Sequence, residues 1–363
     1  MVTKEGMMMK KAKLIFLGSA FLSLCLVGCA NPEPEGSSHS KKSSSDSSLP
    51  VEDDTVDVFV LSGQSNMEGS TYWYHPNNNT PLLEQYMDEA ELDFDMVNED
   101  KGIPNVLTSY YGFYYPNGWA QARSSSLDQS TSESKLTPYF EPTRVGMGVS
   151  DRLKADGRTS YFFGPELGLA YDLAEEATED KPIYLAKCAF SGSGFTKTDG
   201  PQWTSREEDP AKSLFYLLKT YTKNCLDAIE ETGKEPVLRG FLWHQGESDS
   251  GDANYETYLE TLTTDFRNEF EDYAPDGEGD NIAFIDCTIY DSGGQSNCNK
   301  GKLAFANRSE DDLNFCIDAS STGLNLQRGD DAKGGYNTWH YNTKDEFILG
   351  QAYAKVILDN DLL

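Results

Sequence analysis

The serine at position 65 is the strongest candidate for a catalytic residue in this chain. It lies in the segment Asp57–Gly69, DVFVLSGQSNMEG, where an apolar run ends abruptly at a turn of small residues. The end of a buried strand can present a serine hydroxyl to a cleft, but Ser-Gly-Gln-Ser-Asn is also ordinary turn composition. We therefore treat Ser65 as a candidate nucleophile that needs a base and an acid from elsewhere in the chain.

A serine nucleophile needs a general base, and the chain has four histidines that could supply it. One lies in a Ser-rich segment and another lies among Pro and Asn residues. His244 follows Trp243 in an apolar strand, so we expect it to be buried and hydrogen-bonded as a structural residue. His340 stands in the polar sequence Trp-His-Tyr-Asn before the last helix, and we predict that it takes the Ser65 proton.

The third requirement is an acid that orients the imidazole. Glu247, in the sequence Gln-Gly-Glu-Ser-Asp after an apolar strand, is the best carboxylate, and Asp249 and Asp331 are weaker candidates. Asn337, three residues before His340, can accept a hydrogen bond but has no charge to stabilise an imidazolium. The structural alternative for Glu247 is a loop carboxylate that caps backbone N–H groups.

Acyl transfer to a serine also needs hydrogen-bond donors for the oxyanion of the tetrahedral intermediate. The backbone N–H groups of Ser65 and Gly192 and the side-chain amide of Gln245 form a candidate set. Each of these residue types is also common in turns, so the set depends on whether the fold brings the three together.

The elements that must position these residues alternate between strand and helix patterns. Strand patterns cover 56–61, 182–189, 237–244 and 281–290, and helix patterns cover 165–179, 211–231, 255–273 and 344–357. This alternation predicts an α/β fold with a parallel sheet and helices on both faces. Catalytic groups in open parallel sheets gather at the carboxyl ends of the strands, and the candidate residues follow predicted strands.

Two stretches interrupt the alternation. Residues at about 70–160 form a predicted insertion rich in Tyr and Trp, and residues 291–339 are polar and irregular. The aromatic side chains of the insertion either stack on a substrate near Ser65 or build a small apolar core of their own. The sequence GQSN recurs at 294–297, but no apolar strand precedes it, so we treat that copy as a coincidence.

The N-terminal residues predict export. Residues 1–28 combine a basic segment with a short apolar run that ends in Leu-Val-Gly-Cys, and this sequence resembles a bacterial lipobox. The pattern implies a lipoprotein signal peptide, cleavage before Cys29, and lipidation of its thiol; an ordinary secretory signal is the alternative. Residues 29–54 have the composition of a flexible tether, which leaves 55–363 as an extracytoplasmic domain anchored to a membrane or cell surface.

Charge and cysteine usage restrict the partners. The formal net charge is −30, which opposes binding to nucleic acid or to anionic lipid and suits a neutral substrate. No CxxC pair and no His/Cys cluster of zinc spacing is present, so we expect no metal and no cofactor. Cys287 and Cys298 either form a short disulfide-closed loop or remain structural thiols.

Four segments and the late His340 agree in order and spacing with a known family. The segments are GQSNMEG at 63–69, FGPELGLA at 163–170, KCAFSGSGF at 187–195 and WHQGESD at 243–249. Together they resemble the SGNH-type carbohydrate esterases, above all the sialate O-acetylesterase-like and acetylxylan esterase-like group, carbohydrate esterase family six. The resemblance runs from Asp57 to the C-terminus outside the insertion.

The resemblance implies a three-layer αβα sandwich with a flavodoxin-like parallel sheet and a metal-free serine esterase mechanism. It assigns the nucleophile to Ser65, the base to His340, the acid partner to Glu247, and the oxyanion donors to Gly192 and Gln245. Two residues depart from the family pattern: Asn337, where many relatives have Asp, and Ser191, where Gly is frequent. The first departure leaves open whether the site is a full triad or a Ser-His pair.

The resulting hypothesis is a hydrolase that removes O-acetyl groups from a carbohydrate, an acetylated glycan or a sialic acid, through an acetyl-enzyme intermediate. The alternative is a non-catalytic surface lipoprotein that binds glycan, which the Asn337 departure motivates. A lipid or peptide ester is a less favoured substrate, because the chain is acidic and shows no apolar lid pattern.

Overall fold

The computed structural model describes residues 54–75, 79–111, 137–148, 161–196, 202–204, 213–290, 296–309, 312–319 and 340–363. The predicted signal peptide with Cys29, almost all of the predicted tether, Asp331 and Asn337 lie outside these ranges. Within them, no helix is both long enough and apolar enough to cross a membrane.

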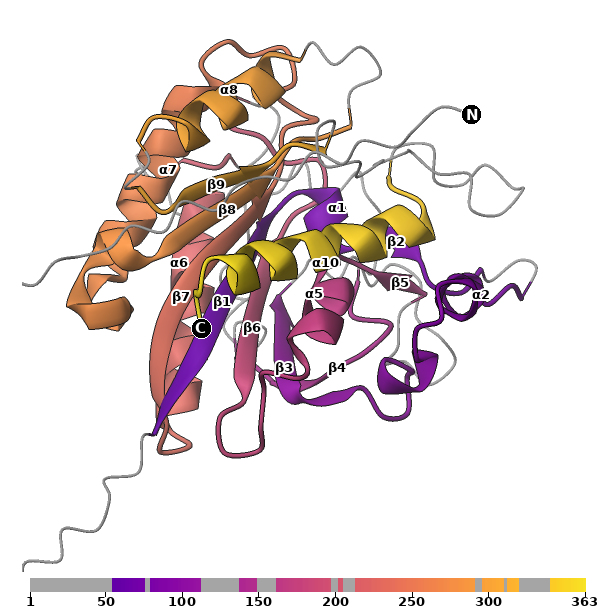
Figure 1. Cartoon of the computed structure of the whole chain (residues 1–363). Coiled ribbons are helices and arrows are strands. Elements are labelled where there is room, and N and C mark those ends of the chain that lie inside the picture. Colours follow the sequence, from indigo (N-terminus) through magenta and orange to yellow (C-terminus); the bar gives the residue numbers. More distant parts are fainter. Residues whose placement is uncertain are drawn as a thin grey trace, which may run out of the picture. The chain divides into compact units, whose positions relative to one another are not determined.

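A seven-stranded sheet in the order β4-β3-β6-β1-β7-β8-β9 forms the centre of the domain (Figure 1). Its strands run parallel to their neighbours, except that β4 is antiparallel to β3. The strands are β1 (Thr55–Gly63), β3 (Ile103–Tyr111), β4 (Glu141–Thr143), β6 (Ile183–Ala189), β7 (Glu235–His244), β8 (Ala283–Cys287) and β9 (Asn314–Ile317). Strands β6-β1-β7-β8-β9 reproduce the flavodoxin-like order, in which the ligand crevice opens at the switch point between β1 and β7.

Strand β1 shows why this sequence builds a sheet that is covered on both faces. Val58 and Val60 pack into one apolar cluster, whereas Phe59 and Leu61 pack into the other. Successive side chains of a strand point to opposite faces, so a continuous apolar run is stable only where both faces are buried.

Helices cover the two faces of the sheet and complete the three layers (Figure 1). One cluster receives α6 (Leu214–Glu230), α7 (Tyr255–Glu269) and α8 (Asn297–Ala306), and the other receives α2 (Leu82–Glu89), α5 (Glu166–Leu173) and α10 (Thr343–Asp359). The smaller elements are α1 (Ser65–Glu68), the β2 (Thr71–Tyr72) and β5 (Phe162–Phe163) pair, and the 3-10 turns η1 (Phe94–Met96), η3 (Glu271–Tyr273), η4 (Pro275–Gly277) and η5 (Gly279–Asn281). The predicted αβα sandwich is confirmed.

The predicted strands and helices are present, with ends that shift by a few residues. Strand β3 lies inside the 70–160 stretch, yet it is an interior strand of the main sheet. Its polar residues Asn105, Thr108 and Ser109 obscure the strand pattern in the sequence. Within the fold, the hydroxyl of Thr108 hydrogen-bonds with that of Thr143, and the hydroxyl of Ser109 hydrogen-bonds with that of Tyr221. Helix α8 and strand β9 likewise lie within the polar 291–339 stretch.

Two aromatic residues near the start of the 70–160 stretch pack inward, whereas Tyr139 is 76% exposed. Tyr72 is buried and stacks on Phe162 with ring centroids 4.4 Å apart, and Trp73 is buried against the main core. These two side chains contribute to apolar packing, and the aromatic residues between 112 and 136 lie outside the described residues.

The described cysteines are free thiols, so no disulfide joins Cys287 to Cys298. Cys287 lies at the end of β8 and donates weakly to the carbonyl of Thr288, whereas Cys298 packs against Gly246. Both thiols therefore act as buried packing residues.

Candidate active site

Ser65 stands at the sheet's switch point because of a tight turn after β1. Gly63 has φ of +144°, and a Cβ atom there would lie 2.1 Å from the carbonyl oxygen of His244, so only glycine fits. The next residue, Gln64, donates its backbone N–H to the same carbonyl at 3.0 Å. The turn is thus fastened to the end of β7, and Ser65 begins helix α1 directly beyond it.

The loop after β7 is held on Gln64. The side-chain oxygen of Gln64 accepts from the backbone N–H groups of Gly246 (3.4 Å) and Ser248 (3.3 Å) and from the Gln245 amide (3.2 Å). The loop that carries Glu247 is therefore shaped by the residue before the candidate nucleophile.

Asn66 joins the two other segments that the sequence singled out. Its amide nitrogen donates to Glu247 Oε1 at 2.7 Å, and its Oδ1 accepts from the backbone N–H of Tyr341 at 3.4 Å. These contacts bridge 181 and 275 positions of sequence. The structure thus brings the loop of Glu247 and the segment of His340 to the turn that carries Ser65.

The His340 segment has a second attachment on the chain just beyond α1. Thr71 Oγ1 donates to the carbonyl of Tyr341 at 2.9 Å, and Thr343 Oγ1 donates to the carbonyl of Tyr72 at 2.8 Å. Asn342 then caps helix α10 by accepting from the N–H of Asp345. The start of α10 is therefore fixed beside the Ser65 turn.

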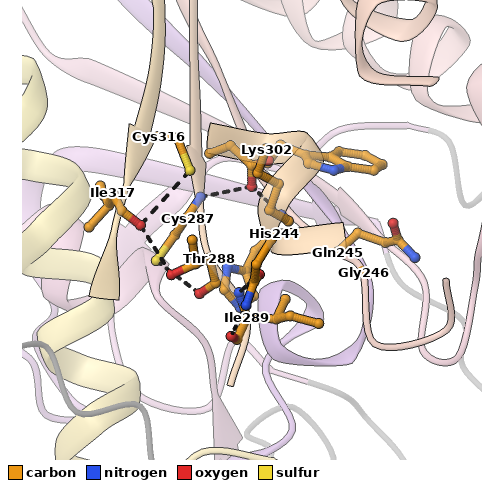
Figure 2. Close-up of polar contacts among 12 residues, drawn as sticks. His244, Gln245, Gly246, Cys287, Thr288, Ile289, Lys302, Cys316 and Ile317 are labelled. Carbon is orange, nitrogen blue, oxygen red and sulfur yellow. Dashed lines mark hydrogen bonds and ion pairs between the residues drawn. The ribbon is translucent and has the colours of Figure 1, made fainter. Parts of the chain in front are cut away.

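His244 is a structural residue, as its apolar strand predicted. It is fully buried, and its two ring nitrogens lie 3.0 Å from the hydroxyl of Tyr341 and 3.4 Å from that of Tyr353. Burial, and then the charge of Lys302, lower the pKa of His244 well below its ordinary value. Figure 2 shows Lys302 close to His244, above Cys287 at the end of β8. An imidazole held neutral in this way cannot accept the serine proton efficiently.

Lys302 forms a buried ion pair with Asp286 that sequence reasoning missed. Burial raises the pKa of Asp286 to about 6, although the lysine charge opposes this rise. Lys302 lies on α8 in a stretch that reads as an irregular polar loop, so no sequence signal indicated that it points into the core.

Gln245 is placed differently from the expected oxyanion donor. It is fully buried, and its amide nitrogen lies within 3.2 Å of acceptors on Gln64, Ser193 and Asp249. Its oxygen accepts from the hydroxyl of Tyr255 at 2.6 Å. An amide nitrogen has only two hydrogens, and these already face three acceptors, so Gln245 would have to withdraw a hydrogen from these partners in order to bind an oxyanion.

The other two donors stand at backbone turns. Ser65 is the first residue of α1, where a backbone N–H has no acceptor within the helix. Gly192 has φ of +69°, a left-handed conformation that suits glycine, in the turn after β6.

Asp249, one of the weaker acid candidates, has a structural role. Its carboxylate accepts from the N–H of Phe195 at 2.9 Å, from the hydroxyl of Thr196 at 3.0 Å and from the Gln245 amide at 2.8 Å. It therefore fastens the turn after β6 to the loop after β7.

A buried charged network lies beneath α1, and the sequence analysis did not assign it a role. Lys187 on β6 is fully buried, pairs with Glu166 at 2.9 Å, and donates to the backbone carbonyls of Met147 (2.6 Å) and Glu68 (3.2 Å). Its ammonium lies 4.3 Å from the centre of the Tyr110 ring. The signal was present in the sequence as a lysine inside an otherwise apolar strand.

Glu68 closes this network on the side of the candidate site. Its carboxylate accepts from the backbone N–H of Ser191 at 2.9 Å, from the Ser191 hydroxyl, and from the Tyr110 hydroxyl at 3.2 Å. Burial raises the pKa of Glu68 to about 7, against the opposing effect of these hydrogen bonds.

Among solved structures the fold has several counterparts. NanS matches with a TM-score of 0.51 and 14% sequence identity over 85% of this chain and 98% of that chain, which shows the fold. A protein from Arabidopsis thaliana has a TM-score of 0.48 and 18% identity over 84% and 98% of the two chains. A carbohydrate acetylesterase from Xanthomonas citri has a TM-score of 0.44 and 12% identity over 83% and 55%.

Among curated proteins, none matches this sequence significantly. The sequence profile of one family, described as carbohydrate esterase, sialic acid-specific acetylesterase, matches residues 55–359, which include every strand and helix of the sheet fold. The chain therefore belongs to the carbohydrate esterase, sialic acid-specific acetylesterase family, whose members are carboxylic ester hydrolases.

Proposed function

We propose that this protein removes O-acetyl groups from a carbohydrate by a serine esterase mechanism with an acetyl-enzyme intermediate. The observation that carries the proposal is the pair of hydrogen bonds at Asn66, which donates to Glu247 and accepts from the N–H of Tyr341 and so links the Glu247 loop and the His340 segment to the turn of Ser65. Family membership supplies the substrate class.

In the first half-reaction, the Ser65 oxygen attacks the acetyl carbonyl while His340 takes the hydroxyl proton. The oxyanion of the tetrahedral intermediate accepts hydrogen bonds from the N–H groups of Ser65 and Gly192, which are worth several kcal/mol in such sites, on the order of 3 per donor. The bond between the acetyl carbon and the sugar oxygen then breaks, and His340 returns its proton to that oxygen.

In the second half-reaction, His340 takes a proton from water, and the resulting hydroxide attacks the acetyl group on Ser65. Collapse of the second tetrahedral intermediate releases acetate and returns the proton to the serine oxygen. Glu247 supplies the negative charge that favours the imidazolium form of His340 in both steps. Asn66 then holds Glu247 and the His340 segment in a common frame.

The test is acetate release from a panel of acetylated sugars, run alongside labelling by a fluorophosphonate probe. The proposal expects acetate from at least one sugar and probe attached to the peptide that contains Ser65. A protein that binds acetylated glycan, releases no acetate and takes up no probe would instead be the non-catalytic glycan-binding lipoprotein.

We also propose that the protein is a lipoprotein anchored outside the cytoplasm through Cys29. The support is the lipobox-like sequence at 26–29 and the tether composition of 29–54. Expressed in a bacterium with its leader, the protein should partition into the detergent phase, and Cys29→Ala should leave it in the aqueous phase. Equal partition of the two proteins into the aqueous phase would indicate an ordinary secretory signal.

A further inference from the structure

Glu68 is a buried carboxylate next to the proposed nucleophile that takes no part in the reaction steps above. We propose that Glu68 is a positioning residue that fixes the turn of Ser191 and Gly192 against helix α1, and so sets the spacing between the two backbone oxyanion donors. The inference rests on the proposed function for its catalytic consequence, but the tether itself can be measured without any activity.

Glu68 connects the two elements that carry the backbone oxyanion donors. Ser65 and Glu68 are the first and last residues of the one-turn helix α1. The Glu68 carboxylate accepts both the backbone N–H and the hydroxyl of Ser191, and Gly192 follows immediately in the chain. One side chain therefore spans from the element of the first donor to the element of the second.

Glu68 is itself held in place by contacts with the sheet. It is fully buried, and the ammonium of Lys187 donates to its backbone carbonyl at 3.2 Å. The hydroxyl of Tyr110 donates to the carboxylate oxygen that Ser191 does not use. Lys187 is in turn paired with Glu166 on α5. Through these contacts, Glu68 fixes both backbone donors relative to the sheet.

The hydrogen-bond donors around Glu68 match the two oxygens of its carboxylate. Ser191 offers two hydrogens to one carboxylate oxygen, and Tyr110 offers one to the other. Glutamine keeps one oxygen for Ser191, and its NH₂ group can donate to the hydroxyl of Tyr110 if that hydroxyl reverses its role. Glu68→Gln is therefore the conservative variant, and Glu68→Ala removes the tether.

The kinetic test compares Glu68→Ala, Glu68→Gln and Ser191→Ala on p-nitrophenyl acetate. Misplacing an oxyanion donor affects the transition state and not the bound ester, so Glu68→Ala should lower kcat about 100-fold and leave KM within about 2-fold. Glu68→Gln should recover most of this loss. Ser191→Ala, which keeps the backbone N–H, should fall between them. Affinity for a tetrahedral phosphonate should fall in parallel with kcat.

The control is Asp57→Asn. Asp57 pairs with Arg239 at 2.5 Å near the start of β1, at the end of the sheet away from Ser65. Loss of this pair should lower the melting temperature and leave kcat and phosphonate affinity unchanged. A folded Glu68→Ala protein with wild-type kcat would overturn the positioning role.

Hydrogen–deuterium exchange tests the tether directly, independent of catalysis. In Glu68→Ala, the amides of Ser191 and Gly192 should exchange faster than in the wild type, while those of β6 stay protected. Unchanged exchange at Ser191 would refute the inference even if the esterase proposal holds. If these amides exchange faster in Glu68→Ala but the wild type hydrolyses no acetyl ester, the tether is supported and the proposed function is refuted.

Discussion

Asn66 and Glu247 show how single side chains define this site. Asn66 donates to Glu247 at 2.7 Å, and its other end accepts from the residue after His340. An amide N–H donates to a carboxylate without adding a charge of its own, so this contact positions Glu247 beside the turn of Ser65. The acid role of Glu247 thus stays compatible with the position that the structure gives it.

We predict that Glu247→Gln lowers kcat far more than Asn337→Ala does. Removing the charge should cost about 100-fold or more, because the imidazolium that forms on His340 loses its electrostatic partner. Asn337→Ala should stay within about 3-fold, since its amide carries no charge to lose. Steady-state kinetics on p-nitrophenyl acetate measure both, and the reverse ranking would assign the orienting role to Asn337.

The ionisation of Glu68 should be visible in the pH dependence of stability. Its pKa is raised to about 7 in the folded protein. A group that binds its proton more tightly when folded stabilises the fold fully below its unfolded pKa, near 4.5, and this contribution is lost as pH rises through about 7.

Glu68→Gln cannot titrate at this position. The unfolding free energy of the wild type minus that of Glu68→Gln should therefore fall between about pH 4.5 and 7, by an amount on the order of 2 to 3 kcal/mol, and then level off. Urea unfolding at a series of pH values measures this difference. A difference that is flat across the window would show that Glu68 stays ionised throughout.

At the residue scale, candidate residues in loops that directly follow apolar strands could be predicted from the sequence. The charged residues buried in the core could not. Ser65 and Glu247 follow apolar strands, so their position at the carboxyl ends of the parallel strands could be predicted. Glu68 and Lys187 have partners far apart in the chain, at Ser191 and Glu166, and only the fold shows these pairings. The Gln245 amide likewise has hydrogen-bond acceptors on residues far away in the chain, Gln64 and Ser193, which the sequence alone does not show.

At the element scale, glycine residues allow helices α5 and α10 to pack closely against each other. A Cβ at Gly168 on α5 would lie 1.9 Å from the carbonyl oxygen of Phe347 on α10, and one at Gly350 on α10 would lie 2.1 Å from that of Pro165. The backbones of α5 and α10 therefore approach closely, and this contact sets where α10 begins, two residues after Tyr341.

Gly350→Ala should force these helices apart. We expect a loss of about 1 to 3 kcal/mol or more in unfolding free energy, since the new methyl group meets backbone atoms that cannot move aside cheaply. Gly251→Ala is the matched control, because a Cβ there meets no atom within 4 Å. Thermal unfolding compares the two, and equal melting temperatures would contradict the close crossing.

Elements with continuous apolar runs were predictable, and those with polar faces were not. Strands β6 and β7 are buried almost throughout, so their sequences carry a clear signal. Strand β3 satisfies its hydroxyl groups through partners on β4 and α6, which no local pattern indicates. Its recovery as a sheet strand required the long-range pairing with β6.

At the scale of the whole molecule, topology and charge act together. The strand order puts the switch point between β1 and β7, and Ser65 and the loop of Glu247 follow these two strands. The chain carries a formal net charge of −30, so its overall field repels anionic substrates within roughly a Debye length of the surface, about 10 Å at moderate salt.

We predict that salt separates neutral from anionic substrates. The kcat/KM for a neutral acetylated sugar should change less than about 2-fold between about 0.02 and 0.5 M salt, whereas that for an acetylated sialic acid should rise as its carboxylate is screened. Acetate release at a series of salt concentrations measures both values. A sialic acid ester whose rate falls with salt would indicate a cationic subsite in the crevice.

The most direct test of the central claim is the rate of p-nitrophenyl acetate hydrolysis by Ser65→Ala. The variant should lose essentially all activity, at least about 1000-fold in kcat/KM, because no serine oxygen remains to form the acetyl-enzyme. Its melting temperature should stay close to that of the wild type, since the change removes one hydroxyl group. A well-folded Ser65→Ala protein that hydrolyses the ester at the wild-type rate would contradict the account.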